Sequence, residues 1–139
     1  MPPKTTRPPT PEEIAELVAF LPRLETEGMP PIKCWHGGPN AAEGTFTFPW
    51  PEYQAVVSAF FAAVSNECWL DYAYDTNRAA ALLADVEAVR NASLDEIKTM
   101  LTYCLRGERF CDGHWGILIE NGAIRRLLQR LQVLQGADR

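Results

Sequence analysis

Apolar residues recur at steps of three and four positions along most of the chain, which is the spacing of one helix face. The segments that follow this spacing are 11–24, 51–64, 76–90, 94–107, 113–120 and 123–134. Pro22 should kink or stop the first of them, because proline removes an amide donor from a helix interior. The pattern predicts about five to six helices.

Two of these helices begin with a recognisable capping sequence. Thr10-Pro11-Glu12-Glu13 and Ser93-Leu94-Asp95-Glu96 each place a hydroxyl three residues before a glutamate. This is the spacing of a capping box, in which side chain and main chain exchange hydrogen bonds at a helix start. We therefore expect firm helix starts at residues 11 and 94.

The helical spacing is absent between Pro30 and Pro51. Here "IKCWH" and "TFTF" alternate on either side of the turn-forming stretch GGPNAAEG, which predicts a small β-hairpin near residues 31–49. The aromatic residues of this region could line a groove, but we expect them to pack in the core or as a lid. They are Phe46, Phe48, Trp50 and Tyr53.

The 139 residues, 47% of them hydrophobic, suit one domain with its own core. We expect a mainly α fold, a single compact helical domain over residues 10–134. The proline-rich residues 1–9 should form a disordered lead-in, and residues 135–139 a flexible tail. No apolar run approaches the ~20 residues of a membrane span. With no secretory signal in the N-terminal stretch, we expect a cytoplasmic protein with reduced cysteines.

The net charge of −5 is unevenly distributed. Residues 1–97 carry 6 basic and 14 acidic side chains, whereas residues 98–139 carry 7 and 4. Such a chain lacks the broad cationic surface of nucleic-acid-binding proteins, although Arg125, Arg126 and Arg130 lie together on the last helix. Nucleic acid and membrane are therefore not the expected partners.

Two kinds of reactive site remain open at the cysteines and histidines. Cys34, His36, Cys111 and His114 would supply the ligand types of a zinc site, but C-x-H and C-x-x-H are not its usual spacings. Cys111 near a helix start, with a histidine three residues on, could be a nucleophile. We expect neither a metal nor a cofactor.

The stretch "CLRGERFCDGHWG", residues 104–116, concentrates charged and aromatic side chains around glycines at a predicted junction of helices. Two arginines beside a tryptophan suit an anionic ligand or a partner, whereas arginines and acids that neutralise one another would make a structural corner. The candidate binding residues are Arg106, Glu108, Arg109, Asp112, His114 and Trp115.

The segment "LTYCLRGERFCDGHWGILIENGAIRRLLQRL", residues 101–131, resembles a bacterial family known as domain of unknown function 6508. "FPWPEY" at 48–53 and "DY" at 71–72 extend the resemblance over most of the chain after residue 12. The resemblance implies no activity, cofactor or mechanism. It directs attention to its signature positions Arg106, Gly107, Arg109, Phe110, Asp112, Gly113 and Trp115.

No catalytic triad, zinc knuckle or phosphate loop is recognisable, and the two halves differ in charge sign, which favours steered docking. We therefore expect a non-catalytic protein-interaction module that engages another protein through its acidic N-terminal half and the 106–115 corner. The alternative is an enzyme or ligand sensor that holds an anionic small molecule at the same corner. Whether the chain is an enzyme, and its oligomeric state, stay open.

Overall fold

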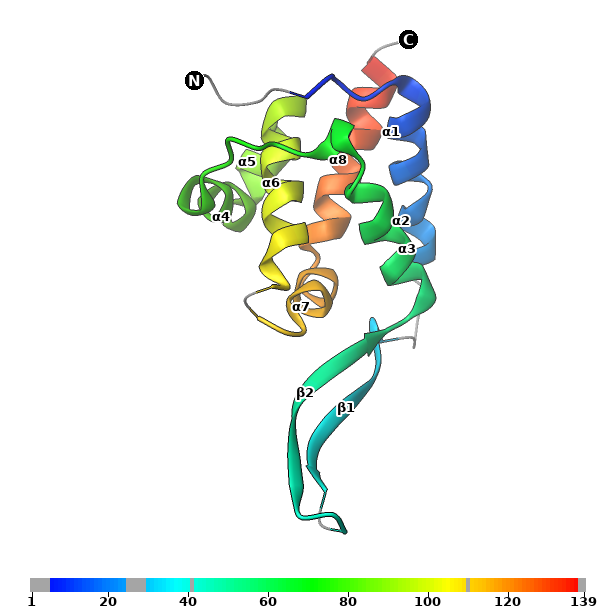
Figure 1. Ribbon diagram of the computed structural model, residues 1–139. Helices are drawn as coiled ribbons and strands as arrows, with labels where there is room; N and C mark the ends of the chain where they lie inside the picture. The colour runs from blue at the N-terminus through cyan, green and yellow to red at the C-terminus, as the bar shows by residue number, and fades with distance from the viewer. Residues whose placement is uncertain (1–5, 25–29, 41, 110, 138–139) are drawn as a thin grey trace.

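A computed structural model of the chain describes residues 6–24, 30–40, 42–109 and 111–137. Its helices form one packed body, from which a long β-hairpin projects (Figure 1). The elements are α1 Pro11–Val18, α2 Phe20–Leu24, β1 Ile32–Asn40, β2 Thr45–Tyr53, α3 Ala55–Val64, the 3₁₀ turn η1 Glu67–Trp69, α4 Thr76–Ala84, α5 Val86–Arg90, α6 Leu94–Gly107, α7 His114–Glu120 and α8 Ala123–Ala137.

The expected fold class, mainly α with a small β-hairpin, is confirmed. The core lies mainly among α1, α3, η1, α6 and α8, where apolar side chains are almost completely enclosed. The largest of them are Leu17, Phe60, Phe61, Trp69, Ile97, Met100, Leu101, Ile124, Leu127, Leu128 and Leu131. Burial of these side chains supplies the main driving force for folding.

Both capping boxes form as the sequence predicts. The Thr10 hydroxyl accepts from the amide of Glu13 and the Glu13 carboxylate accepts from the Thr10 amide, and Ser93 and Glu96 repeat the exchange at α6. These bonds satisfy amides that the first helical turn leaves without partners.

Two predicted helices are each divided in two, so the described chain has more helices than the five to six expected. The first divides at Ala19 and not at Pro22, because Pro22 lies in the first turn of α2, where no amide donor is required. The segment 76–90 divides at Asp85, whose carboxylate caps α5 by accepting from the amides of Glu87 and Ala88.

The hairpin extends beyond the predicted residue 49. β2 continues to Tyr53, with Pro51 opposite Trp35 and Glu52 opposite Cys34, and α3 begins only at Ala55. The prediction of a helix start at Pro51 is therefore wrong, since proline at a helix start and proline in an edge strand look alike in sequence.

The domain boundaries stay a prediction. Residues 1–5 of the expected lead-in lie outside the described residues, whereas Thr6 and Arg7 contact the body: Thr6 donates to the Leu70 carbonyl at 2.9 Å and Arg7 pairs with Glu13 at 2.6 Å. α8 continues to Ala137, into the expected tail. None of the helices in the described part of the chain is long and apolar enough to cross a membrane.

Candidate functional site

Glu108 joins three elements at the corner, which comprises the described residues 106–109 and 111–115. The signature position Phe110 lies outside the described residues. Its carboxylate accepts hydrogen bonds from the Tyr53 hydroxyl of β2 at 2.7 Å and from the amides of Gly113 and Trp115 at 3.0 Å each. It therefore caps the start of α7 and holds the base of the hairpin. Burial, and next the bond to Glu108, raise the pKa of the Tyr53 hydroxyl above its ordinary value.

Trp115 is fixed by contacts on several sides. Its indole stacks on Phe61 with centroids 4.2 Å apart, lies 5.2 Å from the Tyr53 ring, and donates its N–H to the Leu105 carbonyl at 3.2 Å. The indole is therefore a structural link between the corner, the hairpin base and the core, and only part of it stays accessible.

Arg106 and Arg109 border an open hollow of about 480 Å³ that Glu108 and Trp115 also line. The Arg106 guanidinium lies over the Tyr74 ring at 5.2 Å and near the Tyr72 ring at 5.9 Å, and Arg109 is exposed. Within the described part of the chain, neither arginine forms an ion pair with a carboxylate. The acids of the corner therefore do not neutralise these cations.

His114 and Asp112, the remaining predicted site residues, do not line this hollow. The His114 ring packs edge-on to Tyr103 at 5.6 Å and lies under Gly107, where an added Cβ would come within 2.3 Å of it. Burial lowers the pKa of His114, and its Nε2 has no hydrogen-bond partner among the described residues. Asp112 is exposed at the surface.

The proposed nucleophile is not assembled in the described residues. The exposed Cys111 thiol approaches the Asp112 carbonyl at 4.0 Å, and no hydrogen bond joins it to the His114 ring. On α8, Arg130 donates to the Ala92 carbonyl at 2.9 Å and Arg126 to the Asn121 carbonyl at 3.4 Å. Those two arginines are engaged with main-chain oxygens of the body.

The projecting hairpin carries exposed aromatic side chains. Phe46, Phe48 and Trp50 were expected to pack in the core or as a lid and do not, whereas Tyr53, the fourth residue of that set, packs against the core. Trp35 is 52% exposed, Phe46 61%, Phe48 83% and Trp50 49%. Phe46 and Phe48 contact each other edge-to-face at 5.6 Å, and the two strands that carry the exposed aromatic residues project from the helical body (Figure 1). We call β1 and β2 together the hairpin arm. Its exposure was not predictable from alternation, which is the same for a covered and an uncovered strand.

The base of the arm is packed against α7. Gly113 has a left-handed backbone with φ of 89°, and an added Cβ there would lie 3.2 Å from the Trp35 ring. At Gly116 an added Cβ would lie 3.0 Å from the Ile32 side chain. These two glycines let the strands approach the helix closely.

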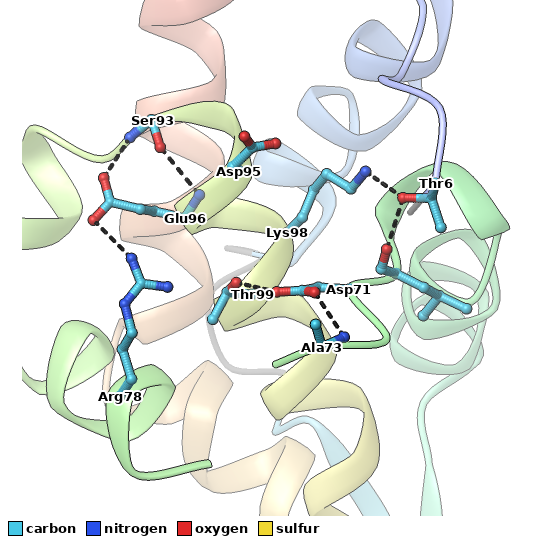
Figure 2. Close-up of a pocket in the computed structure, with 10 residues that line it drawn as sticks. Thr6, Asp71, Ala73, Arg78, Ser93, Asp95, Glu96, Lys98 and Thr99 are labelled. Carbon is cyan, nitrogen blue, oxygen red and sulfur yellow. Dashed lines mark hydrogen bonds and ion pairs between the residues drawn. The ribbon is translucent and has the colours of Figure 1, made fainter. Parts of the chain in front are cut away.

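A second, polar pocket of about 450 Å³ lies between α4, α6 and the chain after η1 (Figure 2). Lys98, only 7% exposed, donates to the Thr6 hydroxyl and to the Arg7 carbonyl, while Thr99 donates to Asp71. Arg78 lies 3.8 Å from Glu96. Sequence reasoning missed this pocket, because Thr6 and Asp71 are brought to α6 only by the fold. Its polar groups largely satisfy one another.

One protein-family model matches residues 9–137, and it is described as a family of unknown function, DUF6508. No curated protein and no solved structure matches the chain.

Removing the Glu108 carboxylate should destabilise the protein. Glu108→Ala leaves three donors without their partner, and hydrogen bonds to a charged acceptor contribute about 1.5–3 kcal/mol each before relaxation. We expect urea denaturation to show a loss of about 3 kcal/mol in the free energy of unfolding. Asp112→Ala, at an exposed carboxylate four residues on, should stay within about 0.5 kcal/mol. Equal losses in both variants would contradict the assigned role.

Burial of His114 should make the protein less stable in mild acid. Because its folded pKa lies below the unfolded value of about 6.5, the unfolded chain binds the proton more readily. Above about pH 6.5 His114 is neutral in both states, and the free energy of unfolding is not reduced. It falls as the pH drops from there toward the lower folded pKa. His114→Gln should therefore flatten the fall of unfolding free energy with pH, by at most about 1.4 kcal/mol per pH unit. Equal slopes in chemical denaturation of both proteins would refute this.

Proposed function

The chain belongs to the family of unknown function DUF6508, and we propose from its geometry that it is a non-catalytic protein-interaction module. The observation that carries the proposal is the hairpin arm, which projects from the helical body and carries exposed aromatic side chains. The occupant is a partner protein with an apolar groove bordered by carboxylates.

The chemistry of the arm supports an apolar groove. Between residues 34 and 51 the only formally charged side chain is Glu43, near the hairpin turn. Interface centres are enriched in tryptophan and phenylalanine and depleted of charge, and the residues that dominate binding are often aromatic. An exposed aromatic set on a charge-poor strand pair fits that composition.

The backbone of the arm supports the same conclusion. Among the described residues β1 and β2 pair only with each other, so each strand has one edge open. An isolated two-stranded hairpin is marginally stable in water, and open edges readily accept a further strand. A partner that covers the aromatic residues would stabilise the arm as well as bind it.

The corner is the reason for expecting carboxylates at the border of the partner's groove. Tyr53 contacts both Glu108 and Trp115, so the arm ends beside the hollow that Arg106 and Arg109 border. Two guanidinium groups without carboxylate partners in the described chain are suited to acidic side chains at the rim of an interface. Acids placed there would also increase the association rate.

Photo-crosslinking in cells of the source organism tests the module. A benzophenone amino acid at Phe48, which is 83% exposed, should give one defined crosslinked protein whose attachment site lies in an apolar groove. With that partner purified, Phe48→Ser should weaken binding about tenfold or more, while the melting temperature stays unchanged.

Val133 on α8 provides the matched control, since it is an exposed apolar residue remote in sequence from the arm. The same crosslinker there should not capture that partner. Crosslinks from position 48 only to a second copy of the chain, or unchanged affinity of Phe48→Ser, would contradict the proposal.

A second candidate function rests on the hollow beside Trp115. Arg106 and Arg109 border about 480 Å³ of open space, which suits an anionic small molecule as well as a partner's carboxylates. In this alternative the chain is a ligand sensor or an enzyme. Of the six candidate residues, the two arginines would contact the ligand, and Glu108, His114 and Trp115 would position the corner. Asp112 is exposed and does not line the hollow.

Thermal melting with inorganic phosphate and with a nucleoside diphosphate tests this alternative. A ligand at 100 times its Kd stabilises by about 2.7 kcal/mol, which raises the melting temperature by several degrees. Arg106→Gln and Arg109→Gln should abolish the shift, and Arg90→Gln, on α5, should retain it. No shift, or a shift that survives both corner variants, would exclude an anion site here.

A further inference from the structure

Three side chains of different chemistry converge on one face of the hairpin arm. The Cys34 Sγ lies 3.3 Å from the His36 Nε2, and the same nitrogen lies 2.8 Å from the Glu52 Oε1. The thiol, imidazole and carboxylate atoms all lie within 4.8 Å of one another. This is the one such group of metal-ligand side chains in the described part of the chain.

Strand geometry produces the cluster. Side chains two residues apart point to the same face of a strand, so Cys34 and His36 are neighbours on β1. Glu52 stands directly opposite Cys34 in the antiparallel register, on the same face of β2. Strand pairing therefore brings Glu52 next to His36 and Cys34, which lie 16 and 18 positions before it in the sequence.

We propose that Cys34, His36 and Glu52 bind a zinc-class divalent cation, with the fourth coordination position open to water or to a side chain of the partner. Thiolate, imidazole and carboxylate are the three ligand types that zinc accepts from proteins. A thiolate and a carboxylate together neutralise the two positive charges of the cation.

Two of the three separations between ligand atoms lie near those of a tetrahedral site, and the third, between Cys34 and Glu52, is within 4.8 Å. Bonds of ~2.3 Å to sulfur and ~2.0 Å to nitrogen and oxygen place neighbouring ligand atoms about 3.3–3.6 Å apart. The Cys34–His36 separation of 3.3 Å already reaches that range, and the His36–Glu52 separation of 2.8 Å has to widen by about 0.5 Å. The Glu52 side chain, which is 41% exposed, has room to rotate away from the His36 ring.

Neighbouring groups hold the ligands in place. The His36 ring stacks on Trp50 with centroids 4.3 Å apart and planes 24° apart, which limits its rotation. The second oxygen of Glu52 lies 3.5 Å from the Lys33 ammonium, so the first oxygen stays directed at His36. Partners of this kind orient metal ligands.

This ligand set differs from the zinc ligands considered from the sequence. Cys34 and His36 are present in both, but Glu52 completes the cluster in the structure, and neither Cys111 nor His114 belongs to it. The unusual C-x-H spacing, which argued against a zinc knuckle, is the natural spacing of two ligands on one strand.

Titration of the reduced full-length protein with Co²⁺, followed by Zn²⁺ competition, tests the site. We expect one equivalent to produce a thiolate-to-cobalt charge-transfer band and the intense visible absorption of tetrahedral cobalt. Cys34→Ser should abolish the charge-transfer band, and His36→Asn and Glu52→Gln should each weaken Zn²⁺ binding by about 100-fold or more, since even supporting residues cost 10–100-fold.

Cys111→Ser is the matched control, because it removes the other exposed thiol of the chain. It should leave stoichiometry, spectrum and affinity unchanged. Circular dichroism of each variant checks that the helical body is folded. The absence of a one-to-one cobalt complex, a charge-transfer band that survives Cys34→Ser, or a band lost in Cys111→Ser would each overturn the proposal.

Discussion

The carboxylate of Glu108 determines how the two parts of the molecule are joined. It lies where α6 ends and accepts hydrogen bonds from the start of α7 and from Tyr53 at the base of the arm. A carboxylate that accepts three donors resists reorientation, because each lost bond leaves a partly buried polar group without a partner. The bond from Tyr53 ties the base of the arm to the corner, and the two amide bonds hold the start of α7, which carries the Trp115 indole.

The residues that stabilise the fold differ from those that we propose for recognition. The helical body buries its apolar residues and satisfies its helix starts without help from the distal half of the arm. The arm can therefore carry Phe46 and Phe48 at its surface, where they contribute little to folding. The same exposed strands that a partner could cover also hold the cluster of Cys34, His36 and Glu52 on one face. The surface proposed for recognition and the proposed metal site thus lie on the same two strands.

The helices were predictable because capping and apolar spacing are local properties, as the starts of α1 and α6 at Thr10 and Ser93 show. The corner was located by composition, but the roles within it were not predictable. Glu108 and Arg109 are adjacent charged residues, yet one is bonded internally and the other is exposed, since only the fold brings Tyr53 beside Glu108. Glu52 was overlooked for the same reason. Its relation to Cys34 depends on strand register, which sequence spacing alone does not fix.

The claim that Glu108 fixes the arm to the body is tested most directly by residual dipolar couplings of backbone amides. In the wild-type protein, couplings from the arm and from α6 should fit a single alignment tensor. In Glu108→Ala, couplings from the arm should shrink and require a tensor of their own. Wild-type couplings that already need two tensors, or a variant that still fits one, would contradict the account.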